Sequence, residues 1–185
     1  EQGKTFGSNE VLKLHTDAHK NMAQLPLLSL PVKRSIGHAP VSLTLFAKKT
    51  SKAFDPHHRV MLCAMKKSFD EMNVTWLNRP QIDYSKCIIS GSSIEVNRPT
   101  CFTIPDRFHK DTKQNTLDVA LFLVFTDLPS NEVLTSARSE DLIRTTQIND
   151  EVHFYSSEAR SVFWRPRLSS MESACAERVW PPSKV

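Results

Sequence analysis

Hydrophobic and polar residues alternate along the segment Val41–Ala47, which opens the most strongly patterned part of the chain. A period of two that is rich in β-branched and aromatic residues is typical of a strand with one buried face. After Asp55 the period changes to 3.6, and one helical stripe collects Met61, Ala64, Met65, Phe69 and Met72. Because Asp55 is a good N-cap and Pro56 a good first helical residue, the pattern predicts a helix over Pro56–Met72 and a β-α-β start.

Further along the chain, several short runs predict more strands and a second helix. Val119–Phe125 is apolar at every position, as expected of a central strand covered on both faces. The other predicted strands are Asn73–Leu77, Lys86–Ser90, Cys101–Ile104 and Val152–Tyr155, and the polar turn between the middle two makes them an extended hairpin. Ser130 is a candidate N-cap for a helix over Ser130–Leu142. The order β-α-β-β-α-β predicts a ferredoxin-like α+β sandwich with extended N- and C-terminal arms.

The ends of the chain differ from this predicted domain, which spans residues 41–155. In the N-terminal arm, residues 1–40, Asn9–Met22 could form a short helix. Prolines then interrupt the chain around Leu27 and Leu28, so this stretch is expected to lie along a partner or along its own domain. The C-terminal extension, residues 156–185, interleaves basic and aromatic residues, and its candidate partner-binding residues are Trp164, Arg165, Arg167 and Trp180. Such residues suit nucleic-acid contact and protein docking equally.

Composition narrows the function only slightly. The net charge of +4 is compatible with nucleic-acid binding but does not demand it. No apolar run approaches the roughly 18 residues of a membrane span. The four cysteines form no C-x-x-C pair, which predicts free thiols and a reducing compartment. The sequence begins at Glu1 rather than Met. Either the removal of a presequence or a sequence that is a fragment would explain this.

Motifs for catalysis are missing from the sequence. It contains no H-E-x-x-H, no G-x-S-x-G and no glycine-rich phosphate loop, and only four glycines. His57 and His58 are adjacent and so would not face the same way on a helix. We therefore expect no enzyme activity, no metal site, no cofactor and no small-molecule substrate.

The order of the predicted elements resembles that of the small-subunit ribosomal protein S-ten family over residues 41 to about 149. The segments that carry the resemblance are Val41–Ala47, Pro56–Met72, Val74–Pro80, Lys86–Ser90, Val96–Arg98, Phe102–Lys110, Val119–Phe125 and Ser130–Leu142. The chain departs from the family at Asp111, where the family has a basic residue, and by about seven inserted residues over Asp111–Leu117. It also has a longer linker over Lys48–Phe54.

The resemblance implies a structural component of the small-subunit head of a mitochondrial ribosome, located in the mitochondrial matrix. Its partners would be rRNA and neighbouring subunits, and basic loop residues would contact phosphates. The predicted RNA-binding residues are Lys48, Lys49, Lys52, Arg79, Lys86, Arg98, Arg107, His109 and Lys110. Each such contact would add salt-dependent affinity without reading base sequence.

Two other interpretations remain open. The chain could be a non-catalytic accessory subunit of another large organellar complex, such as a respiratory assembly, in which case its partners would be proteins alone. Cys101, His109, Asp118 and Pro129–Leu134 also resemble the stretch that precedes the active site of leishmanolysin-type metalloproteases. The sequence holds no zinc-binding helix of that type, so this resemblance implies no protease activity.

Overall fold

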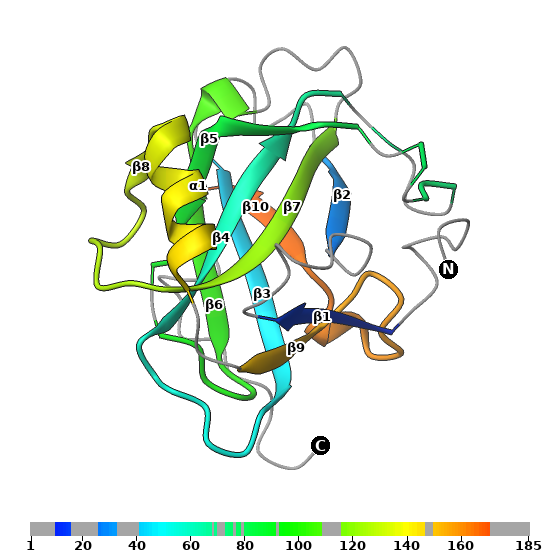
Figure 1. Cartoon of the computed structure of the whole chain (residues 1–185). Coiled ribbons are helices and arrows are strands. Elements are labelled where there is room, and N and C mark those ends of the chain that lie inside the picture. Colours follow the sequence, from blue (N-terminus) through cyan, green and yellow to red (C-terminus); the bar gives the residue numbers. More distant parts are fainter. Residues whose placement is uncertain are drawn as a thin grey trace.

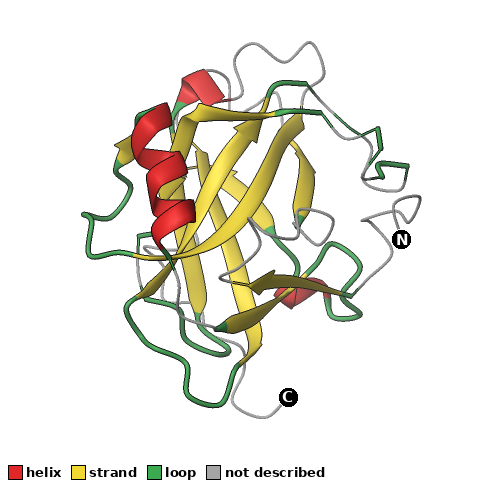
Figure 2. Cartoon of the chain, in the orientation of Figure 1, coloured by secondary structure: helices red, strands yellow, loops and turns green. Residues whose placement is uncertain are grey.

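The protein is mostly β, with two antiparallel sheets, one of them a half-barrel, and one short α-helix in the part of the chain that the structure describes. The computed structural model describes residues 10–15, 26–32, 41–67, 69, 73–75, 77–78, 80–91, 93–108, 116–146 and 150–170. Figure 2 shows that strands make up most of this structure, with the helix along one side.

The first sheet has the order β1-β9-β3-β10, with β6 also paired to β3 (Figure 1). Its strands are β1 (Val11–His15), β3 (Val41–Thr50), β6 (Pro99–Ile104), β9 (Glu151–Tyr155) and β10 (Arg167–Ser170). β9 pairs with Ala47–Thr50 and β10 with Val41–Thr44, so the two strands line successive parts of β3. The segment between β9 and β10 contains the 3-10 helix η4 (Val162–Trp164).

The second sheet has the order β2-β7-β4-β5-β8. Its strands are β2 (Leu27–Pro31), β4 (His58–Met65), β5 (Ile82–Ile89), β7 (Thr116–Phe125) and β8 (Val133–Leu134). The helix α1 (Ser136–Thr145) follows β8, and the 3-10 helix η3 (Asp106–Phe108) follows β6. The first turn of α1 is capped by Thr135, whose side chain accepts a hydrogen bond from the backbone N–H of Arg138.

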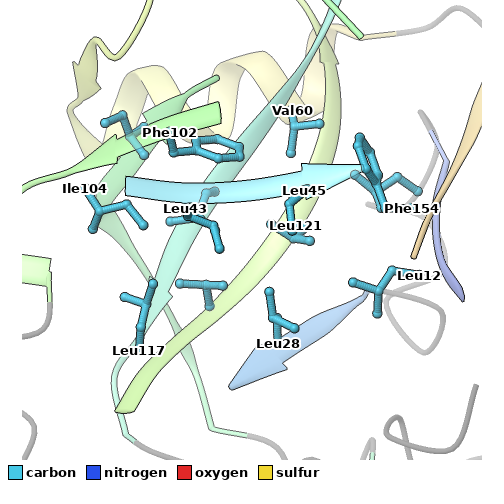
Figure 3. Packing of buried hydrophobic residues seen from close by; sticks show 14 of the residues in the cluster. Leu12, Leu28, Leu43, Leu45, Val60, Phe102, Ile104, Leu117, Leu121 and Phe154 are labelled. Carbon is cyan, nitrogen blue, oxygen red and sulfur yellow. The ribbon is translucent and has the colours of Figure 1, made fainter. Parts of the chain in front are cut away.

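Two hydrophobic clusters divide the interior. The first lies between the sheets, where residues such as Leu28, Leu43 and Leu121 point toward one another (Figure 3). The second lies on the outer side of the second sheet, beneath α1, and includes Met61, Phe122 and Leu142. The second sheet is therefore buried on both faces.

The helix predicted over Pro56–Met72 is wrong, because the structure has strand β4 there. The apolar residues of β4 alternate between the two clusters: Val60, Leu62 and Ala64 enter the first, and Met61, Cys63 and Met65 enter the second. A continuous apolar run fits a helical stripe and a doubly buried strand equally well, and pairing with β5 and β7 decides the outcome. Asp55 caps a turn instead of a helix, since its carboxylate accepts from the backbone N–H of His57.

The ferredoxin-like sandwich is contradicted by the pairing of the strands as well. The two strands predicted as a hairpin belong to different sheets, because β5 pairs with β4 and β8 whereas β6 pairs with β3. The predicted second helix exists, but it begins at Ser136, and the hydroxyl of Ser130 instead donates to the backbone oxygen of Gly91. Val11–His15 form a strand, β1, within the stretch Asn9–Met22 that was expected to be able to form a helix.

The prediction of free thiols is also wrong. Cys63 and Cys87 face each other across the β4–β5 pair and form a disulfide in the second cluster. Cys101, on β6, is disulfide-bonded too. Among the described residues no cysteine is free. Since disulfides form and persist in oxidising environments, the inference of a reducing compartment loses its basis.

Candidate functional site

The outer face of the first sheet displays polar and basic side chains. On β1 and β9 the side chains of Leu12, Leu14, Val152 and Phe154 enter the core between the sheets. Because successive residues of a strand point to opposite faces, the residues between them face outward. These outward residues are Lys13 and His15 on β1, and Glu151, His153 and Tyr155 on β9.

The register of the strands sets three basic side chains in one row. Lys13 lies opposite His153 across the β1–β9 pair, and His153 lies opposite Lys49 across the β9–β3 pair. Neighbouring strands are about 4.8 Å apart, so the row spans roughly 10 Å. Lys13 and Lys49 are exposed, and His153 is partly buried between them.

An irregularity in β3 adds a third lysine beside this row. Ala47 enters the core opposite Phe154, and the register then shifts before Lys49. A bulge of this kind sets two residues of one strand against one residue of its partner and redirects their side chains. Lys48 also reaches the outer face, where its Nζ lies 5.8 Å from the centre of the Tyr155 ring. We call Lys13, His15, Lys48, Lys49, His153 and Tyr155 the basic face.

The basic face has one carboxylate of its own, that of Glu151. It contacts the Nε2 atom of His153 and lies 3.7 Å from the Nε2 atom of His15. Partial burial raises the pKa of Glu151, but the hydrogen bond with His153 and the charges of His15, His153 and Lys13 together bring that pKa below its ordinary value. Glu151 therefore stays ionised and balances only part of the positive charge.

The lysines of the basic face form no close ion pair with a carboxylate of the described residues, although the charge of Lys13 acts on Glu151. No ion pair involves Lys48 or Lys49 there, whereas Arg98 is paired with Glu95 and Arg144 with Asp141. The basic face therefore presents three lysines whose positive charge no close carboxylate of the described residues neutralises.

The loop between β9 and β10 closes the other end of this sheet face. The rings of Phe163 and Trp164 each lie 5.4 Å from the ring of Phe46, which is fully buried beneath them. Trp164 stacks on Tyr155 at 5.2 Å, and the guanidinium of Arg167 lies 5.2 Å from the ring of Phe163. These rings seal the sheet, and they border the basic face at Tyr155.

A buried hydrogen-bond network holds the chain that follows β3. His58 is fully buried, and its Nδ1 lies 3.2 Å from a carboxylate oxygen of Asp150, just before β9. Asp150 also accepts from the hydroxyl of Ser51 and from the backbone N–H of Asp55. The β3–β4 connection is therefore fixed against the start of β9, which orients the strand ends that carry the basic face.

The structure brings together only some of the predicted RNA-binding residues. Lys48 and Lys49 lie on the basic face, and Lys52 is exposed on the loop just beyond it. The others are separated: Lys86 is half-buried on β5 in the second sheet, Arg98 is ion-paired with Glu95, and Arg107 is exposed on η3. Arg79, His109 and Lys110 lie outside the described residues.

The predicted partner-binding residues mostly serve the fold itself. Leu27 and Leu28 are buried on β2, one in each cluster, so this stretch lies along its own domain. Trp164 packs on Phe46, and the Arg165 Nε donates to the backbone oxygen of Ala159 within the same loop. Of the other two predicted residues, Arg167 is exposed beside Phe163, and Trp180 lies outside the described residues.

Sequence reasoning missed Lys13, His15 and His153. The signal was present, because Val11–His15 and Glu151–Tyr155 both alternate between apolar and polar residues. The helix predicted over Asn9–Met22 concealed it for Lys13 and His15. His153 could be recognised as part of a basic row only once the pairing of β9 with β1 and β3 was known.

Within the described ranges, no group of three or more His, Cys, Asp or Glu side chains could hold a metal ion. No described helix is both long and apolar enough to cross a membrane. The sequence matches no protein-family model, and it matches no curated protein.

Proposed function

We propose that this protein is a non-catalytic binding module whose basic face holds an acidic polysaccharide. The observation that carries the proposal is the cross-strand row of Lys13, His153 and Lys49, with Lys48 beside it. These lysines are exposed and have no ion-pair partners among the described residues, so their charge is available to a ligand.

The arrangement favours a polymer with repeated negative charges. The cations are distributed along adjacent strands of a sheet, and small-molecule sites are instead concave, with a few polar groups that converge on one point. A chain of carboxylates or sulfates laid across the strands would meet several cations in succession. Its binding would release counterions and would weaken as salt rises.

The disulfides favour a polysaccharide over a nucleic acid. Cys63–Cys87 and the disulfide-bonded Cys101 are typical of secreted or otherwise oxidised compartments, where acidic glycans are abundant polyanions. The predicted roles in a mitochondrial ribosome or an organellar complex, and the predicted matrix location, are untested. The ribosomal resemblance, however, rested on a ferredoxin-like order of elements that the structure contradicts.

Calorimetric titration with a polyuronate tests the proposal. The double variant Lys48→Glu/Lys49→Glu should bind about tenfold more weakly, because two cations that attract the polyanion become anions that repel it. The matched control is Lys66→Glu/Lys67→Glu, which makes the same change in net charge at two exposed lysines just after β4, in the other sheet. This control should bind like the wild type.

The same titration separates the alternatives. A neutral dextran should not bind, and single-stranded RNA should bind more weakly than the polyuronate at equal salt. Tighter binding of RNA would favour the ribosomal prediction instead. Equal losses in both double variants would show that net charge alone, and not the basic face, governs binding, and the proposal would fail.

A further inference from the structure

One sequence triplet, Asn73-Val74-Thr75, has the Asn-x-Ser/Thr pattern of an N-glycosylation acceptor, and it is the only such triplet in the 185 residues. The pattern alone is common by chance, so its meaning depends on where the asparagine lies and on the compartment through which the chain passes. The structure shows where Asn73 lies, and its disulfide indicates the compartment.

Asn73 is exposed in a turn of the connection between β4 and β5. The next residue, Val74, is buried in the second hydrophobic cluster and so anchors the turn to the body of the protein. Thr75 and Asn78 close the turn, since the Thr75 N–H donates to Asn78 Oδ1 at 2.6 Å and Asn78 Nδ2 donates to the backbone oxygen of Asn73 at 3.2 Å. A large group on Asn73 would thus extend into solvent without displacing the core.

The disulfide framework supplies the second, independent observation. Cys63 and Cys87 lie on the two strands that flank this connection, and the segment that their disulfide closes contains Asn73. Disulfides of this kind form in the oxidising lumen of the secretory pathway, which is also where asparagine is glycosylated. The disulfide therefore indicates that the chain passes through the secretory pathway, where the Asn73 triplet can be glycosylated.

We infer that Asn73 carries an N-linked glycan in the mature protein. The donor would be an oligosaccharide joined to a polyprenyl diphosphate. Asn73 Nδ2 would form a bond to the first carbon of the sugar and lose a proton, while the bond from that carbon to the diphosphate oxygen breaks and the polyprenyl diphosphate leaves. No oxidation or reduction takes place.

The glycan would leave the basic face uncovered. Val74 packs into the cluster on the outer side of the second sheet, whereas the basic face lies on the outer side of the first sheet. The inference consequently does not depend on polysaccharide binding, and either can fail without the other.

The test is secretion of the full chain from a eukaryotic cell, followed by peptide mass mapping before and after treatment with the glycan-releasing amidase PNGase F. We expect one glycan, on the Asn73 peptide, and a single downward shift of the band on denaturing gels after release. Thr75→Ala should abolish the glycan while it retains Asn73, and Thr75→Ser should keep it. The matched control Asn78→Asp keeps the oxygen that bonds Thr75 and leaves the triplet intact, so its glycan should remain.

Two results would overturn the inference. One is wild-type protein that is secreted with the Cys63–Cys87 disulfide formed and the Asn73 peptide unmodified. The other is a glycan that persists on the Thr75→Ala variant, which would place the modification elsewhere. Because mapping is done on the wild type, poor folding of a variant cannot obscure the answer.

Discussion

The outer faces of the two sheets differ in what covers them. On the second sheet, Met61 and Phe122 are sealed beneath α1, and the Cys63–Cys87 disulfide lies in the same layer. On the first sheet, the loop between β9 and β10 covers Phe46, while Lys13 and Lys49 stay open to solvent. Both sheets share the same inner core, so the contrast arises outside it.

The difference can be followed to the residue patterns of the strands. β7 is buried from Leu117 to Val124 and can serve only a sheet packed on both sides. β1 and β9 alternate, so each contributes to the core with one face and leaves the other to water. The closed face therefore adds a second buried apolar layer to the core between the sheets, and the open face leaves its polar side chains in contact with water.

The largest effect is expected from opening the closed face. Phe122→Ala removes a buried ring and should lower the free energy of unfolding by about 3–5 kcal/mol. Phe125→Ala, at the exposed end of the same strand, is the matched control and should cost far less. Urea unfolding measures both. Equal losses would mean that the layer beneath α1 is not tightly packed.

Loss of the disulfide should come next. The double variant Cys63→Ala/Cys87→Ala should lose about 2–4 kcal/mol, because the crosslink restricts the unfolded chain. Its affinity for a polyuronate should be unchanged at temperatures where it is folded, since the disulfide lies on the far side of the second sheet. A parallel loss of affinity would show that the two faces are coupled.

The sequence allows some of this fold to be predicted. The strands predicted over Val41–Ala47 and Val119–Phe125 are confirmed. Alternation indicates the first strand, and the short length of the second apolar run favours a buried strand over a helix. β4 was mistaken for a helix because alternation between two apolar clusters leaves no polar position to mark the period. Sheet order could not be predicted, since β6 skips β5 to pair with β3 and local pattern contains no such information.

The basic face was harder to predict from the sequence than the fold. Lys48 and Lys49 were singled out as basic residues, but as part of a loop, and only the bulge in β3 explains why both face the same way. Their neighbours Lys13 and His153 are more than a hundred residues apart in the sequence and meet through the β1–β9 pair. A site assembled by strand register is invisible until the register is known.

A smaller effect on stability is expected at Glu151, where Glu151→Gln removes a charge from the open face and changes the packing little. Its pKa in the folded protein is below the ordinary 4.5, so its ionised form stabilises the fold above that pH, and this stabilisation is lost as the pH falls through the folded pKa. Glu151→Gln should therefore flatten the decline of the thermal midpoint below about pH 4.5. Half-exposed charges are screened, so the change should be modest.

The same variant should strengthen polyuronate binding at neutral pH, because it removes the one carboxylate of the basic face. Lys48→Glu/Lys49→Glu would then move affinity in one direction and Glu151→Gln in the other. Unchanged affinity in Glu151→Gln would show that the polymer does not pass over β9.

The smallest effect is expected at Arg160, on the loop between β9 and β10. Its Nε lies 3.5 Å from Glu10 Oε1, but the side chains are 94% and 54% exposed. Exposed ion pairs contribute little because water and salt screen them, so Arg160→Ala should leave the unfolding midpoint unchanged within error. Trp164→Ala should lower it clearly, since its ring covers Phe46 and stacks on Tyr155. If Arg160→Ala proved as damaging as Trp164→Ala, charge rather than ring packing would hold this loop, and the contrast between its apolar seal and the neighbouring basic face would disappear.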